Sequence, residues 1–216
     1  MLYQGISSEK GLDIKHEGEY VEYNRDWVKD EIKKDSNLSL PKHVFDTLKN
    51  GWYFTLSTRF DFFDAKKFKE RLIIASVIPT GEAEGSNCFG NSLYLAGLTP
   101  SDILIDGKNH VRKGYPGIED YLGRLDKINS LDENAIIAYY DKGKICHFVY
   151  WEKERKEFFD RTGLWRPLRG YKSLPKSNTL DVVIFDASKR IDFNDLFPLS
   201  LDDAHDCIAN SHASDE

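Results

Sequence analysis

The sequence predicts an α+β fold, and three observations support this prediction. The 216 residues include 13 Phe, 11 Tyr and 4 Trp, an aromatic content typical of sheets rather than of Leu/Ala-rich helical bundles. Between residues 135 and 160, three apolar runs are separated by short charged gaps, which is typical of β-hairpins. Around residue 85, a Gly-marked polar loop leads into a short apolar helix. One chain is therefore expected to combine helices with an antiparallel sheet.

Residues 1–38 are polar and charged, and helices and strands are expected to follow them as far as residue 78. A short helix is predicted near residues 27–34. Pro41 suits the start of a second helix, because the first turn has N–H groups without intrahelical partners. Asn50 and Gly51 end that helix. The remaining elements expected here are a strand at 52–57, an amphipathic helix at 64–71 and a buried strand at 72–78.

A cysteine lies in the first turn of the next predicted helix. Ser86 or Asn87 is expected to cap this helix, and Gly97 is expected to end it. A thiol at residue 88 would feel the positive end of the helix dipole and the unpaired N–H groups, which favour the thiolate. The alternative is that Cys88 is a buried structural cysteine, because free cysteines are often buried.

The C-terminal half contains the clearest sheet signal. A helix is expected at about 117–128, followed by strands at 135–140, 145–151 and 157–160. The linking segments 141–144 and 152–155 are charged or contain glycine, as hairpin turns do. A further strand is expected at 179–185, after a Gly- and Pro-marked loop at 162–177.

The composition limits the classes of protein to which this chain can belong. The net charge of −6 without a clustered basic face disfavours nucleic acid as a partner. Three cysteines at irregular spacing form neither a disulfide framework nor a C-x-x-C zinc motif. The sequence shows no signal-peptide pattern and no apolar run of membrane-spanning length. We therefore expect a cytoplasmic protein that does not bind membranes, and export by a route without a cleaved signal stays open.

The chain is expected to form a single domain over residues 1–200, with a core at about 39–190. The acidic segment 201–216 is expected to be a disordered tail. A zinc site from Cys88, Cys146 and His147 is disfavoured, because adjacent strand residues point to opposite faces.

Counting residues across a hairpin brings a histidine and an acid together. If residues 152–155 form the turn, His147 lies directly opposite Asp160, on the same face of the sheet. The carboxylate would then hold one imidazole nitrogen and leave the other free to act as a base. The alternative is that His147 is a structural residue whose hydrogen bonds are all made within the sheet or core, and that Asp160 merely ends a strand at a turn. A one-residue change in the turn would separate the two side chains.

Together with Cys88, this pair forms the set of groups that thiol catalysis requires. A thiol becomes a strong nucleophile when a base removes its proton, and that base needs a third group to orient it. The helix start adds N–H donors for an oxyanion. The expected roles are Cys88 as nucleophile, His147 as general base and acid, and Asp160 as orienting group, meeting in one accessible pocket.

The order and setting of these residues resemble the papain-like fold superfamily, in particular its NlpC-type branch of cell-wall peptidases and amidases. In that branch an Asp-Cys-Ser-Gly motif starts a helix that packs on a small antiparallel sheet, and a His-Val-Gly-like strand follows. Here Asn87-Cys88-Phe89-Gly90 keeps the cysteine and glycine but replaces the Asp and Ser. The segment 147–150 matches the histidine strand loosely. The resemblance covers residues 73–185 and implies a papain-like fold, with N-terminal helices before the sheet.

The function expected from residues and resemblance together is a cysteine-dependent hydrolase or acyltransferase acting on an amide or peptide bond. Its partner would be a peptide or protein substrate, and it would need no cofactor or metal. Asn87 would supply a side-chain donor to the oxyanion beside the Cys88 N–H. Segments 152–155 and 162–177 are expected to face the substrate. Two alternatives stay open: a non-catalytic interaction domain on the same fold, and a transglutaminase or deamidase. The oligomeric state is not predicted.

Overall fold

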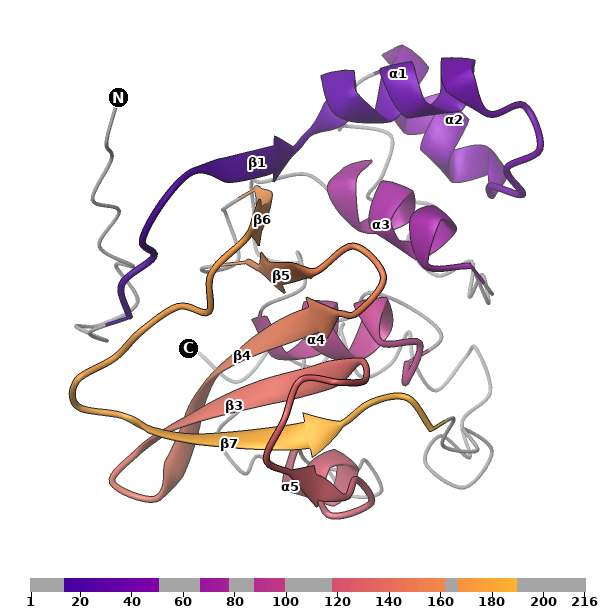
Figure 1. Ribbon diagram of the computed structural model, residues 1–216. Helices are drawn as coiled ribbons and strands as arrows, with labels where there is room; N and C mark the ends of the chain where they lie inside the picture. The colour runs from indigo at the N-terminus through magenta and orange to yellow at the C-terminus, as the bar shows by residue number, and fades with distance from the viewer. Residues whose placement is uncertain (1–13, 51–66, 78–87, 100–117, 162–166, 190–216) are drawn as a thin grey trace, which may run out of the picture.

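The computed structural model describes residues 14–50, 67–77, 88–99, 118–161 and 167–189, and it has an α+β architecture (Figure 1). Within these residues, seven strands form one sheet in the order β1-β6-β5-β4-β3-β7-β2, with antiparallel pairing throughout. The strands are β1 (Tyr20–Tyr23), β2 (Lys127–Ile128), β3 (Ala135–Asp141), β4 (Lys144–Glu152), β5 (Glu157–Asp160), β6 (Leu168–Tyr171) and β7 (Asp181–Asp186). The predicted fold class is therefore confirmed at the level of an α+β chain with an antiparallel sheet.

The predicted hairpin of β3 and β4 forms the centre of the sheet. Lys142 and Gly143 occupy its two-residue turn with φ of 50° and 78°. Two successive positive φ angles give the type I′ turn, whose twist matches that of paired strands. The strands predicted at 157–160 and 179–185 are also present, as β5 and β7.

Three short strands were not predicted. β2 has two residues, and β1 and β6 have four each. β6 falls in the segment predicted as a loop, and β1 in the polar N-terminal region. Strands of two to four residues are too short for an alternation of apolar and polar residues to be recognised.

Five helices lie in the described part of the chain: α1 (Arg25–Lys34), α2 (Lys42–Asn50), α3 (Phe68–Val77), α4 (Cys88–Leu95) and α5 (Ile118–Leu122). The predictions of α1, α2 and α4 are confirmed. Asn24 caps α1, since its side-chain oxygen accepts from the N–H groups of Asp26 and Trp27, each at 3.1 Å. The helix predicted at 117–128 is shorter than expected, because α5 ends before Gly123 and the chain then enters β2.

The buried strand predicted at 72–78 is wrong, because α3 occupies residues 72–77. Leu72, Ile73, Ile74, Ala75 and Val77 are all buried. A helix enclosed by other elements loses its amphipathic pattern, and a short apolar run then looks the same in a helix and in a buried strand. The strand predicted at 52–57 and the tail at 201–216 lie outside the described residues.

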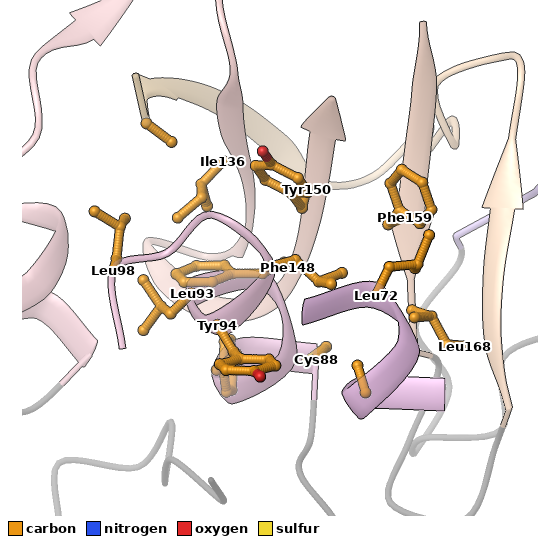
Figure 2. Close-up of a cluster of buried hydrophobic side chains, with 14 of the residues drawn as sticks. Leu72, Cys88, Leu93, Tyr94, Leu98, Ile136, Phe148, Tyr150, Phe159 and Leu168 are labelled. Carbon is orange, nitrogen blue, oxygen red and sulfur yellow. The ribbon is translucent and has the colours of Figure 1, made fainter. Parts of the chain in front are cut away.

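The sheet separates two hydrophobic clusters. The larger one, on the helix side, contains Leu72 of α3, Leu93 of α4, and Phe148 and Tyr150 of β4. Figure 2 shows these side chains gathered between the helices and the strands. The smaller cluster contains Ile137, Tyr139, Val149, Phe158 and Tyr171 of the sheet, and Ile14 of the N-terminal segment. Residues before 39 thus contribute to the core.

Candidate active site

Cys88 is the first residue of α4, and the whole helix is buried. Phe89 packs edge-on against Phe148 of β4, with 4.9 Å between ring centroids. Figure 2 shows Cys88 among the core side chains at the start of the helix. Packing of α4 against β4 therefore fixes where the thiol lies relative to the sheet.

The other end of α4 is held by a glycine and an arginine. Gly97 has a φ of 75°, and the N–H groups of Gly97 and Leu98 donate to the carbonyls of Tyr94 and Leu93, which is the Schellman arrangement. Nε of Arg71, on α3, donates to the carbonyl of Leu95 at 2.9 Å. A cation at a helix C-terminus complements the helix dipole. The predicted helix end at Gly97 is confirmed.

His147 lies at an irregularity in β4. It is paired with Tyr139, whereas the next pair joins Tyr140 to Ile145, so Cys146 is an extra residue in β4. Such a bulge bends a strand and changes the direction of its side chains. The simple alternation assumed for Cys146 and His147 is interrupted at this point.

The predicted register between β4 and β5 is wrong by two residues. Glu152 pairs with Glu157, so the turn is 153–156 and not 152–155. Continuing this register sets Asp160 opposite Val149 rather than opposite His147. A shift of two residues keeps each side chain on its original face, because strand side chains alternate with period two. His147 and Asp160 are therefore diagonal neighbours on one face.

The two side chains form an ion pair, as predicted. Nε2 of His147 lies 2.9 Å from Oδ1 of Asp160, and both side chains are buried. Burial alone raises the pKa of Asp160, but the charges and N–H groups of His147 and His16 outweigh burial and hold that pKa well below its usual range.

His147 also interacts with Cys88. Burial disfavours the imidazolium, but the charge of Asp160, the charge of Cys88 and hydrogen bonds with both side chains raise the pKa of His147 well above its ordinary value. Because Nε2 is next to the carboxylate, Nδ1 is the nitrogen left for the sulfur. The structure thus brings together the three predicted residues, with the histidine between the thiol and the carboxylate.

A second histidine, which the sequence reasoning missed, contacts the same carboxylate. Nε2 of His16 lies 2.9 Å from Oδ2 of Asp160. The His16 ring stacks on that of Tyr171 with 4.1 Å between centroids. His16 lies in a polar N-terminal segment, 131 residues before His147, and no local pattern relates the two positions.

The site is more enclosed than predicted. Cys88 is 2 % exposed, His147 2 % and Asp160 1 %, so the three do not meet in an open pocket. The oxyanion donor proposed at Asn87 lies outside the described residues, as does segment 162–166. Of the segments expected to face the substrate, 152–155 begins with the buried strand residue Glu152.

The rest of the described chain adds two findings. Among the described residues, no group of three or more His, Cys, Asp and Glu side chains is arranged to hold a metal ion. In the same residues, every helix is too short or too polar to cross a membrane. Compared with known proteins, the chain matches no family model, no curated protein and no solved structure.

Proposed function

We propose that this protein is a cysteine-dependent hydrolase or acyltransferase that acts on an amide or peptide bond. The observation that carries the proposal is the position of His147, which interacts with the Cys88 sulfur and with the Asp160 carboxylate 2.9 Å from its Nε2. A base held between a nucleophile and an orienting acid is the arrangement required for nucleophilic acyl transfer.

The reaction follows from the roles of these groups. His147 takes the proton of the Cys88 thiol, and the thiolate attacks the carbonyl carbon of the substrate. The C–N bond breaks as the imidazolium returns the proton to the leaving amine, which leaves a thioester on Cys88. His147 then takes a proton from water, whose oxygen attacks the thioester; the C–S bond breaks, the acid is released, and the imidazolium returns the proton to the Cys88 sulfur. Asp160 stays ionised throughout and supports the imidazolium.

The start of α4 supports the same chemistry. Cys88 is the first residue of this helix, and the N–H groups of a first helical turn have no intrahelical acceptor. Such donors can hold the oxyanion that forms when the thiolate attacks. The side chain of Asn87 is proposed as a second donor. A helix start that packs on an antiparallel sheet also agrees with the resemblance to NlpC-type enzymes, and on that basis we propose a peptide as acyl donor.

Burial of Cys88 is also what a structural cysteine would show. A structural thiol, however, needs no ionic partner, and burying a carboxylate and an imidazole carries a desolvation cost of several kcal/mol per ion. Titratable groups with strongly shifted pKa values gather at functional sites more often than elsewhere. The buried pair behind the thiol therefore favours a catalytic role.

One observation favours the non-catalytic alternative. Among the described strands, β1 lies at an edge of the sheet, and Tyr20 and Val21 on it are 38 % and 48 % exposed. An edge strand with exposed apolar residues can pair with an extended segment of another protein. An interaction domain of this kind would not require Cys88 to react.

Acylation by a small activated ester separates these functions. p-Nitrophenyl acetate should release a burst of p-nitrophenol of no more than one equivalent, with the acetyl group on Cys88 by mass spectrometry. Cys88→Ala should abolish the burst and His147→Ala should reduce it, whereas the control Cys146→Ser should retain it. Absence of acetyl-Cys88 in the wild-type protein would contradict the proposal.

The same experiment identifies the acceptor. With a primary amine such as cadaverine present, a transglutaminase would transfer the acetyl group to the amine. A hydrolase would release acetate at an unchanged rate.

A further inference from the structure

We propose that His16 is a positioning residue of this site, which acts by fixing the rotation of the Asp160 carboxylate. The inference rests on the proposed function and extends it to a residue of the N-terminal segment. It starts from one geometric fact: the two oxygens of Asp160 each lie 2.9 Å from a different histidine, Oδ1 from His147 and Oδ2 from His16.

The N-terminal segment is held against the sheet by its backbone. The N–H of Lys15 donates to the carbonyl of Lys176 at 2.8 Å, and the reverse bond measures 2.9 Å. The hydroxyl of Ser173 donates to the carbonyl of Glu17 at 2.7 Å. His16 lies between these anchored residues, so the link between β6 and β7 sets the position of its backbone.

Packing then fixes the His16 side chain. In an extended segment, residues 14 and 16 point to the same side. Ile14 belongs to the hydrophobic cluster on this face of the sheet, and His16 stacks on Tyr171 of the same cluster. The imidazole is held on one side by an aromatic ring, and its Nε2 faces the carboxylate.

Among the described neighbours of Asp160, the Tyr139 hydroxyl does not hold the carboxylate. The rings around it include Tyr139 and Tyr171, and burial together with the charge of Asp160 raises the pKa of both phenols. The Tyr139 hydroxyl, however, donates to the carbonyl of Pro175 at 2.6 Å and not to Asp160. With Oδ2 held by His16, the carboxylate is locked in the rotation that directs Oδ1 at His147.

The test is the titration of His147, followed by NMR of the labelled imidazoles and assigned with His147→Ala. Replacing His16 by Ala should release the carboxylate, so the pKa of His147 should fall toward its ordinary value. Acylation of Cys88 should slow by about tenfold, the lower end of the effect of removing a residue that orients a functional ligand. His16→Gln should restore both, because its amide N–H can still donate to Oδ2.

Glu17→Ala is the matched control. It removes the exposed ion pair of Glu17 with Lys176 from the same segment and leaves His16 in place. This variant should leave the titration of His147 unchanged.

Two results would overturn the inference. An unchanged His147 titration in a folded His16→Ala protein would limit His16 to a structural role. A raised His147 pKa would mean that His16 competes with His147 for the carboxylate. Either result is distinct from failure of the proposed function, in which Cys88 is not acylated even in the wild-type protein.

Discussion

At the scale of single residues, Asp160 is the group on which the site depends. It is one buried negative charge with an imidazole 2.9 Å from each oxygen. Removing one member of a buried ion pair leaves the other charge uncompensated in the protein interior. The carboxylate therefore contributes to the stability of the fold as well as to the proposed chemistry.

Asp160→Ala should lower the free energy of unfolding by about 3–5 kcal/mol. Chemical denaturation at neutral pH measures this loss. The matched control is Asp30→Ala, since Asp30 forms an exposed ion pair with Lys33 at 3.3 Å. Exposed pairs contribute at most about 1 kcal/mol, so the control should change little. Equal effects of the two substitutions would contradict the assignment of Asp160 as a buried, paired charge.

The raised pKa of His147 gives stability a defined pH dependence. A group whose pKa is higher in the folded state stabilises the fold fully below its unfolded pKa of about 6.5, and this contribution is lost as pH rises through the folded value. Asp160 has the opposite sign: its contribution is present above about pH 4 and is lost as pH falls through its lowered pKa. The pair is therefore most stabilising between these limits.

Comparing wild type with His147→Gln by denaturation from about pH 5 to about pH 9 measures the histidine's share. The difference in unfolding free energy should be largest at the acidic end of this range and should shrink toward the alkaline end. A difference that grows with pH would contradict the raised pKa of His147.

At the scale of elements, close packing of β6 against β5 is the most specific feature. A Cβ at Gly170 would lie 2.0 Å from Oε1 of Glu157 and 2.8 Å from Cε2 of Tyr23. The Tyr23 hydroxyl donates to the same Glu157 oxygen at 2.8 Å, so this carboxylate is not free to move. The glycine lets three strands approach one another.

Gly170→Ala should therefore destabilise the protein by about 1–3 kcal/mol, the usual cost of overpacking. Thermal or chemical denaturation tests this. In a Glu157→Ala background, which removes the obstructing carboxylate, the same substitution should cost less. Equal costs in both backgrounds would mean that Glu157 does not limit the space at residue 170.

Elements differ in how far the sequence predicts them. The β3–β4 hairpin was predictable, because Gly143 and the charged turn set the strand ends locally. Residues 68–71 of α3 lie in the predicted helix 64–71, but residues 72–77 were assigned to a strand, because their burial comes from α1, α2 and α4, which the local sequence does not describe. The His147–Asp160 contact was predicted from a register that is wrong by two residues. The contact still forms, because a shift by an even number of residues leaves both side chains on the same face of the sheet. His16 was missed because only tertiary packing brings it to Asp160.

At the scale of the whole molecule, the site lies inside the protein, at the start of α4. Cys88 is buried, whereas Cys146 is only partly so. The size of a thiol reagent should therefore decide which of the two cysteines it modifies first. The sheet and the helices together decide which molecules reach the sulfur.

In a Cys207→Ser protein, iodoacetamide should modify Cys88 before Cys146, because the reagent is small and the proposed function has His147 activate the Cys88 thiol. A maleimide carrying a long polyethylene glycol chain should show the reverse order, because it cannot enter a closed core. Peptide mapping by mass spectrometry measures both orders. The same order with both reagents would contradict the enclosed position of Cys88.

The most direct test of the whole account is the rate at which Cys88 reacts with low-dose iodoacetamide at mildly acidic pH, in wild type and in His147→Ala. If His147 activates the Cys88 thiol as proposed, Cys88 should react much faster than Cys146 in the wild-type protein, and loss of the imidazole should slow Cys88 to the rate of an ordinary thiol. Equally slow reaction of both cysteines, unchanged by His147→Ala, would contradict the account and leave Cys88 as a structural cysteine.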